Sequence, residues 1–226
     1  MNEITCQALP EVDFASVRRI DGLDEISANY APYLADESKL AHQGADYLFF
    51  PTNEAELAAI MREMNKRGAN VTISGARTGL VGGCVPAGGA VVAMDRFDKT
   101  MDIRWDDETN EWRVTAEAAV TLKDLNDWAN KKNFPGLQAR ASDETLAQLE
   151  QYKNDPRSFF YPPDPTEMSA SLGGTVATNA SGAASYKYKD TRNWIRRLHV
   201  ILASGEMLDI PRGKYFATDE RKFTII

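Results

Sequence analysis

Apolar and polar positions in the first third of the chain predict a strand, a helix and a second strand. The stretch Asp46–Pro51 is a short apolar run stopped by proline, as expected of a strand. Asn53 is placed to cap the following helix, with Glu56 in capping-box position, and Gly68 is placed to end it. Apolar residues recur with helical spacing in between, at Leu57, Ile60, Met61 and Met64. The next strand begins at Val71, and such a connection favours parallel pairing of the two strands.

The rest of the chain shows a different pattern, which predicts two hairpins. Its predicted elements are a buried strand at 89–94, a hairpin of 99–105 with 111–116, a helix beginning after Thr121, and a second hairpin of 198–202 with 207–210. The charged stretch 142–153 predicts a helix, which we expect to be exposed and not part of the core.

These elements predict an α+β fold, in which a small parallel α/β lobe is packed on a mainly antiparallel α+β lobe. We place the first lobe at 45–98 and the second at 99–226. Residues 1–44 are polar and mixed, and we expect them to be a leader packed on the outside of the domain.

Four glycines follow the predicted strand that begins at Val71. They stand at Gly75, Gly79, Gly82 and Gly83. Glycine permits positive φ and close approach of another group, so a strand leading into such a loop can direct several backbone N–H groups at one phosphate. The spacing matches neither Walker A, which needs a Lys-Ser/Thr pair after its last glycine, nor the G-x-G-x-x-G fingerprint. A plain surface turn is an equal alternative for the loop alone, so its meaning depends on a second surface.

A second candidate surface lies between the two predicted hairpins. The proline cluster in Tyr161–Thr166 fixes a stiff, extended backbone. Gly173 and Gly174 then precede a short helical turn and are expected to present bare N–H groups at a helix start. The side chains of Thr166 and Asn179 can hydrogen-bond to a polar ligand. Two such segments favour a ligand-binding cleft over a loop-rich connector.

Composition limits the classes of function. A net charge of −7 over 226 residues argues against nucleic acid or anionic lipid as the main partner, because both bind preferentially to basic surfaces. No run of about 18 apolar residues exists, so we expect no transmembrane segment, while peripheral membrane association stays open. Cys6 and Cys84 are too few for a disulfide framework and have no metal-ligand spacing. We therefore expect no metal site and a cytoplasmic location.

At its two glycine-rich segments the chain resembles the FAD-binding domain of the FAD-linked oxidases, the superfamily of vanillyl-alcohol oxidase and p-cresol methylhydroxylase. It is most similar to the branch of glycolate oxidase subunits, D-lactate dehydrogenases and D-2-hydroxyglutarate dehydrogenases. That branch carries P-R-G-G-G-T-G-L-S-G-G at the first loop, then P-D-P-S/T, G-G-x-x-x-x-N-A-G-G and K-Y-G. This chain reads S-G-A-R-T-G-L-V-G-G at 74–83, P-D-P-T at 163–166, G-G at 173–174, N-A-S-G at 179–182 and K-Y-K at 187–189.

The resemblance implies that FAD is the cofactor and assigns two sets of residues to it. The first loop would wrap the pyrophosphate with backbone N–H groups, through Ser74, Gly75, Ala76, Arg77, Thr78 and Gly79. The second segment would line the ribose, pyrophosphate and isoalloxazine edge, through Pro163, Asp164, Thr166, Gly173, Gly174, Thr178, Asn179 and Gly182. Tyr188 would lie near the flavin or adenine end, by analogy with the family.

The chain departs from the family pattern at several glycines. Ala76 and Arg77 replace central glycines of the first loop; a Cβ is tolerated there if φ is negative, and Arg77 could add a phosphate-pairing charge. Lys189 also stands where the family has glycine, and its side chain would have to point into solvent. Gly79→Val is expected to lose FAD, because a β-branched residue resists positive φ and blocks approach to the pyrophosphate.

The resemblance predicts a flavin-dependent oxidoreductase that oxidises a small 2-hydroxy acid of the D-lactate, glycolate or D-2-hydroxyglutarate type. FAD is expected to bind without a covalent link, since the first loop has no histidine and Cys84 lies just past its end. Family members continue into a substrate domain with the catalytic histidines. We therefore assign no catalytic residue and expect the chain to be inactive without that missing C-terminal domain. A flavin-free scaffold or electron-transfer subunit with the same fold is the alternative.

Overall fold

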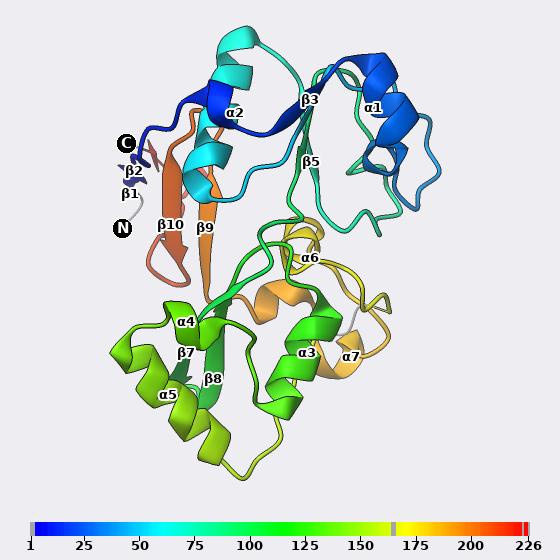
Figure 1. The fold of residues 1–226 in the computed structure, drawn as a ribbon. Coiled ribbons are helices and arrows are strands. Elements are labelled where there is room, and N and C mark those ends of the chain that lie inside the picture. The colour runs from blue at the N-terminus through cyan, green and yellow to red at the C-terminus, as the bar shows by residue number, and fades with distance from the viewer. Residues whose placement is uncertain (1–2, 164–165, 223, 226) are drawn as a thin grey trace. The chain divides into compact units, whose positions relative to one another are not determined.

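The structure is a computed structural model that describes residues 3–163, 166–222 and 224–225 (Figure 1). The chain forms two compact units. Unit 1 combines Met1–Arg96 with Ile195–Ile226, and unit 2 is the continuous segment Phe97–Trp194. Each unit is described by itself below.

Unit 1 contains the predicted strand–helix–strand. Its four-stranded sheet has the order β3-β4-β6-β5, formed by β3 (Arg19–Asp21), β4 (Tyr47–Phe49), β6 (Ala90–Ala93) and β5 (Val71–Ser74). Strands β4 and β5 both pair with β6 in parallel, while β3 pairs with β4 antiparallel. Strands β4 and β5 are therefore parallel, as predicted, but β6 lies between them and they do not pair with each other. Between β4 and β5 runs α2 (Glu54–Arg67). Its first turn is capped by Asn53, whose Oδ1 accepts the N–H of Glu56 at 3.0 Å, and Gly68 ends it with φ of 63°.

The N-terminal segment is part of the core of unit 1, not a leader on its outside. After the 3-10 helix Phe14–Ser16 and strand β3 come α1 (Leu23–Asn29) and a second 3-10 helix, Ala31–Leu34. Ile26 and Leu34 are completely buried and cluster with Leu48 and Val91 of the sheet. The prediction failed because the buried residues of this mainly polar segment are few and widely spaced, which leaves little hydrophobic pattern to read.

A second sheet of unit 1 joins the two ends of the chain. Its order is β2-β10-β9, from β2 (Cys6–Gln7), β10 (Met207–Pro211) and β9 (Arg197–Ile201), and β1 (Glu3–Ile4) pairs separately with β11 (Thr224–Ile225). The β9–β10 hairpin forms as predicted, but it belongs to unit 1 and not to the predicted second lobe. Its turn packs on α2 instead: Arg62 Nη1 donates to Gly205 O at 3.4 Å, and a Cβ on Gly205 would lie 2.6 Å from Ala58 O.

Unit 2 begins with the predicted antiparallel hairpin of β7 (Thr100–Asp106) and β8 (Glu111–Ala116). Its helices are α3 (Leu122–Lys131), α4 (Leu137–Arg140), α5 (Asp143–Asn154), α6 (Leu172–Thr178) and α7 (Ser185–Tyr188), followed by the 3-10 helix Thr191–Asn193. Thr121 caps α3 as predicted, its Oγ1 accepting the N–H of Asp124 at 3.0 Å.

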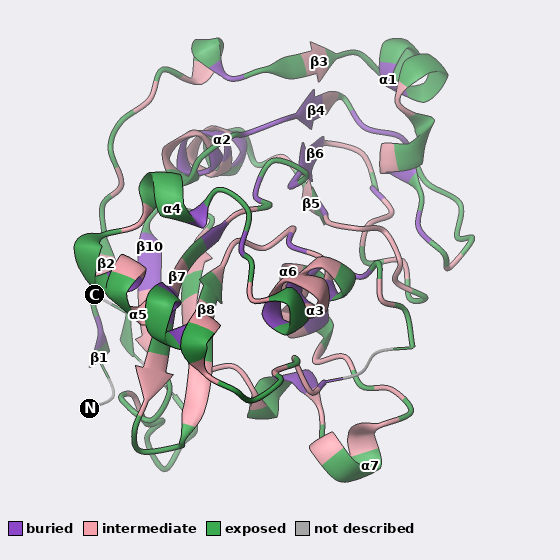
Figure 2. Ribbon diagram, turned by 60° about the horizontal axis from the view of Figure 1, so that its bottom comes forward, coloured by how far each residue is buried: buried purple, intermediate pink, exposed green. Residues whose placement is uncertain are grey.

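Helix α5 is not the exposed excursion that its charge predicted. Figure 2 shows buried positions among the exposed ones along this helix. Leu149 and Tyr152 belong to a core cluster with Ile103 of β7, Leu125 of α3 and Leu137 of α4. The charged residues cover the solvent side and mask a narrow apolar stripe.

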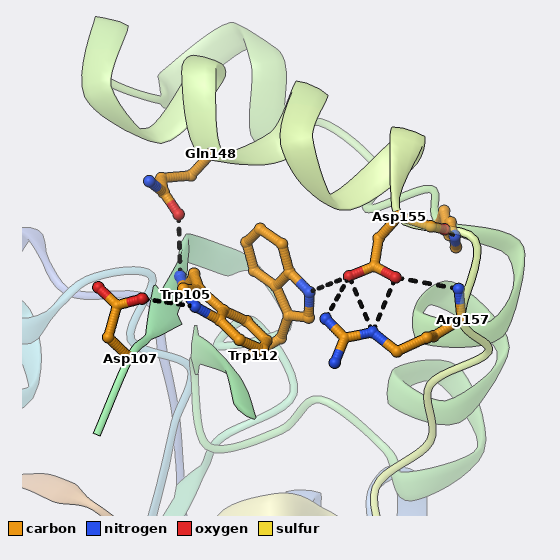
Figure 3. Close-up of polar contacts among 7 residues, drawn as sticks. Trp105, Asp107, Trp112, Gln148, Asp155 and Arg157 are labelled. Atoms are coloured by element: carbon orange, nitrogen blue, oxygen red, sulfur yellow. Dashed lines mark hydrogen bonds and ion pairs between the residues drawn. The ribbon is translucent and has the colours of Figure 1, made fainter. Parts of the chain in front are cut away.

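A network of polar contacts fastens the middle and the C-terminal end of α5 to the β7–β8 hairpin (Figure 3). Gln148 Oε1 accepts the backbone N–H of Trp105 at 2.9 Å, and Trp112 Nε1 donates to Asp155 Oδ2 at 3.3 Å. The Arg157 guanidinium bonds the same carboxylate and lies 4.9 Å from the Trp105 ring centroid. The hydrogen bond from Arg157 holds the pKa of Asp155 well below its usual range. These side chains therefore bond one another and hold the helix on the hairpin.

Candidate functional site

The first glycine loop leaves β5 at Ser74 and returns to β6. Ser74 is completely buried, and its carbonyl accepts the N–H of Met94 at 2.9 Å. The sheet thus fixes where the loop begins and ends. The predicted residues Ser74–Gly79 all lie at this start of the loop, in unit 1.

Arg77 binds its own loop, and its backbone is left-handed. Its φ is +62°, so the condition of negative φ, under which a Cβ would be tolerated at this position, is not met. Nη1 donates to Gly75 O at 2.8 Å and to Ser74 Oγ at 3.2 Å, and pairs with Asp95 Oδ1 at 3.4 Å. The guanidinium also lies 4.7 Å from the Tyr33 ring centroid. These contacts stabilise the bend of the loop, and the idea of a phosphate-pairing arginine gains no support from them.

The next four residues leave their backbone donors unused. Within the described parts of the chain, no acceptor is bonded to the N–H groups of Thr78, Gly79, Leu80 and Val81. Gly79 does not have positive φ, so the strain argument for Gly79→Val is wrong. A Cβ at Gly79 would meet only Asp36 Oδ2, at 3.8 Å, so the backbone is open to close approach. Unpaired N–H groups beside accessible backbone fit a phosphate or diphosphate.

Asp36 anchors the second half of this loop, a role that sequence reasoning missed. Its side chain is buried, with 6% of the residue exposed. Oδ2 accepts the N–H of Cys84 at 3.3 Å, and Oδ1 accepts the N–H of Ser38 at 3.0 Å. Burial alone would raise the pKa of Asp36, but the hydrogen bonds from Ser38, Cys84 and Gly82 outweigh it and hold the pKa below its ordinary value. The carboxylate therefore stays charged at neutral pH.

In unit 2 the predicted glycine pair opens α6, but its N–H groups are not bare. Gly173 N–H donates to Ala118 O at 2.8 Å, and Gly174 N–H donates to the Oγ of the N-cap residue Ser171 at 3.3 Å. Leu172 N–H likewise donates to Val120 O at 2.8 Å. The prediction of free donors at this helix start is wrong, because a neighbouring backbone segment and the cap take them.

Asn179 ends α6 and organises the turn that follows. Its backbone is left-handed, with φ of 49°, a conformation that asparagine tolerates. Its Nδ2 donates to Asp190 Oδ2 at 2.7 Å, and its Oδ1 accepts the N–H of Arg192 at 2.9 Å. Asn179 therefore braces its own turn. Nearby, Thr178 Oγ1 donates to Gly174 O at 3.0 Å, and Gly182 N–H donates to Ser185 Oγ at 2.7 Å.

The remaining predicted residues differ in exposure. Pro163 is buried and Thr166 is exposed, whereas Asp164 lies outside the described residues. Tyr188 is half-buried; its ring meets Phe160 edge-on at 5.6 Å, and its carbonyl accepts the indole N–H of Trp194 at 2.7 Å. All of these residues lie in unit 2. Their contact with a cofactor remains a prediction, as it does for the first loop.

Lys189 has an exposed side chain, as expected, but a backbone that normally requires glycine. Its φ of 66° and ψ of −163° fall in a region that costs a residue with a Cβ about 1–3 kcal/mol. We expect Lys189→Gly to raise the free energy of unfolding of unit 2 by about 0.5–2 kcal/mol, after subtracting about 0.4–1 kcal/mol for the added freedom of the unfolded chain. Urea unfolding, monitored by tryptophan fluorescence, measures this change in the free energy of unfolding.

Lys187→Gly is the matched control for that substitution. It makes the same change two residues earlier, inside α7, where glycine should lower stability by about 1 kcal/mol. If both variants are destabilised, the backbone at Lys189 is not strained.

Neither a metal-binding cluster nor a membrane-spanning helix is found among the described residues. They contain no group of three or more His, Cys, Asp and Glu side chains placed to hold a metal ion. No helix among them is both long and apolar enough to cross a bilayer.

Comparison with known proteins gives a consistent result. A family described as "FAD binding domain" matches residues 45–147 and 142–211. The D-lactate dehydrogenase of Anaerostipes hadrus is 30% identical over 211 residues, 92% of this chain and 38% of that protein. The D-2-hydroxyglutarate dehydrogenase of Xanthomonas citri pv. viticola is 28% identical over 187 residues, 77% of this chain and 34% of its own length. The chain thus spans just over a third of the length of these relatives.

Solved structures support the fold. The 6-hydroxy-D-nicotine oxidase of Arthrobacter nicotinovorans aligns with a TM-score of 0.61 at 12% identity, covering 88% of this chain and 36% of that one. A chitooligosaccharide oxidase aligns with a TM-score of 0.59 at 14% identity, over 88% of this chain and 36% of its own. At these identities the likeness shows a shared fold alone.

Proposed function

Because the chain belongs to the FAD-binding domain family, we propose that it is the FAD-binding portion of a flavin-dependent oxidoreductase acting on a small 2-hydroxy acid. The similarity to relatives named for D-lactate and D-2-hydroxyglutarate carries the choice of substrate class. When bound, FAD supplies the group that accepts two electrons from the alcohol carbon of the substrate. We assign the substrate itself and the catalytic residues to the part of such a protein that this chain does not cover.

The chain's own contribution is to bind and orient the cofactor. The best fit to FAD is at the first glycine loop. There the unpaired backbone N–H groups of Thr78, Gly79, Leu80 and Val81 suit its pyrophosphate. The start of α6 fits less well, since its donors are already bonded, so Gly173 and Gly174 would contribute close backbone approach rather than hydrogen bonds. We propose non-covalent binding, because no histidine lies in the first loop. Two free cysteines are consistent with a cytoplasmic location.

A flavin titration tests the proposal. The purified chain should perturb the FAD absorption spectrum or quench its fluorescence on binding, and acid precipitation of the loaded protein should release the flavin into the supernatant. We expect no turnover of D-lactate, glycolate or D-2-hydroxyglutarate with a dye acceptor by this chain alone, in contrast to a version extended to the length of its relatives. A chain that leaves the FAD spectrum unchanged would favour the flavin-free scaffold or electron-transfer subunit. Equal turnover by both versions would place catalysis within these residues.

A further inference from the structure

Asp36 is a buried carboxylate that belongs to no helix or strand and contacts the first glycine loop. Burial of a charge is costly unless hydrogen bonds compensate it. Here the compensation comes from the loop itself, through the N–H groups of Cys84 and Gly82, and from Ser38 in its own segment. The loop and the carboxylate therefore stabilise each other.

The neighbours of Asp36 follow the same loop. Glu37 N–H donates to Arg77 O at 3.3 Å, and Gln43 N–H donates to Pro86 O at 3.0 Å. Between them Leu40 packs on Gly82, where its Cδ1 lies 2.6 Å from the place that a Cβ would take. The segment 36–43 thus contacts the loop near its start, in its middle and near its end.

Asp36 divides the loop's backbone donors into two groups. The donors at Gly82 and Cys84 are used by the carboxylate, whereas those from Thr78 to Val81 remain unpaired within the described residues. Gly79 lies next to the carboxylate, since its Cβ would be 3.8 Å from Oδ2. A loop fixed in this way keeps its unpaired donors arranged before a ligand arrives, which lowers the entropy lost on binding.

We propose that Asp36 is the positioning residue of the pyrophosphate-binding loop: it anchors residues 82–84 so that the N–H groups of residues 78–81 stay directed at the diphosphate of FAD. This inference rests on the proposed function. Asp36 does not touch the cofactor in this role. It acts through the backbone of the loop.

Substitution of Asp36 in the 226-residue chain tests the inference with two readouts. Asp36→Ala should weaken FAD binding about 10- to 100-fold, because the loop loses hydrogen bonds to a charged group that hold its donors in place. Without any flavin, hydrogen exchange should show the amides of Gly82 and Cys84 exchanging about tenfold faster than in the wild type. Asp36→Asn keeps one acceptor oxygen and should restore part of both properties.

Asp13→Ala is the matched control. Asp13 Oδ1 also accepts a backbone N–H two residues on, from Ala15 at 2.9 Å, but it caps the 3-10 helix Phe14–Ser16. This variant should leave both FAD affinity and loop exchange unchanged. Thermal unfolding of all three variants checks that unit 1 remains folded.

The outcomes separate this inference from the function it rests on. If the wild-type chain binds no FAD but Asp36→Ala accelerates exchange at Gly82 and Cys84, the proposed function fails and the anchoring stands. If Asp36→Ala binds FAD as tightly as the wild type, with unchanged exchange, Asp36 does not position the loop. An equal loss of affinity in Asp13→Ala would also overturn it, because the effect would then be a general one.

Discussion

Tyr152→Ala should lower the free energy of unfolding of unit 2 by about 3–5 kcal/mol, the cost of removing a large aromatic side chain from a packed core. Tyr152 is 1% exposed and lies on α5. Its ring centroid is 5.0 Å from that of Trp112, 5.1 Å from Phe159 and 5.7 Å from Phe134. All four tryptophans of the chain lie in unit 2, so urea unfolding followed by tryptophan fluorescence reports on this unit.

Two further substitutions divide that effect. Tyr152→Phe removes only the hydroxyl, which donates to Ala129 O at 2.7 Å, and should cost about 1 kcal/mol because Lys132 N–H also reaches that carbonyl. Gln151→Ala, at an exposed position of the same helix, should stay within about 0.5 kcal/mol of the wild type. If Tyr152→Ala lowers the free energy of unfolding by less than about 1 kcal/mol, α5 does not contribute to the core and is exposed, as its charged residues suggest.

Gly173→Ala should destabilise unit 2 by about 1–3 kcal/mol through overpacking. An added Cβ would lie 2.7 Å from the Cβ of Ala118 and 3.1 Å from its Cα and carbonyl oxygen. Relieving that contact means moving the start of α6 away from the backbone that accepts the N–H bonds of Gly173 and Leu172. The same fluorescence-detected unfolding measures the loss.

The double variant Ala118→Gly with Gly173→Ala is the test of the steric cause. Removing the Cβ of Ala118 should restore part of the stability, so the two substitutions should not be additive. A Gly173→Ala chain that is as stable as the wild type but no longer binds FAD would contradict the packing explanation. That result would indicate that Gly173 is needed for close approach of the ligand to the backbone.

The elements with a strong local pattern could be predicted from the sequence. Helix α2 shows the apolar spacing, the Asn53 cap and the Gly68 stop that define its ends, and the strands on either side are short apolar runs. The β7–β8 and β9–β10 hairpins are marked by turn residues between apolar stretches. In each case the information lies within about a dozen neighbouring residues, so local propensity and final structure agree.

The features that the sequence did not predict depend on contacts between distant residues. Nothing near Asp36 in the sequence indicates that its carboxylate will bond to the amides at Gly82 and Cys84. Similarly, the motif at 173–174 suggests free donors, and only the folded structure shows Ala118 O accepting one of them. The sign of φ at Arg77 and Gly79 is also set by the whole loop. Family motifs locate the candidate residues, but the hydrogen-bond partners decide which donors remain for a ligand.

The division of the chain into units has a consequence for the order of folding. Unit 2 is continuous, and its first hairpin pairs residues that are close in sequence, from Asp106 with Glu111 to Thr100 with Ala116. The second sheet of unit 1 instead pairs Cys6 with Leu208, across nearly the whole length of the chain. Closing so large a loop is entropically unfavourable and slows folding. During synthesis β2 must therefore wait for β10, and the backbone donors and acceptors of β2 stay open to other pairings until the second unit has been made.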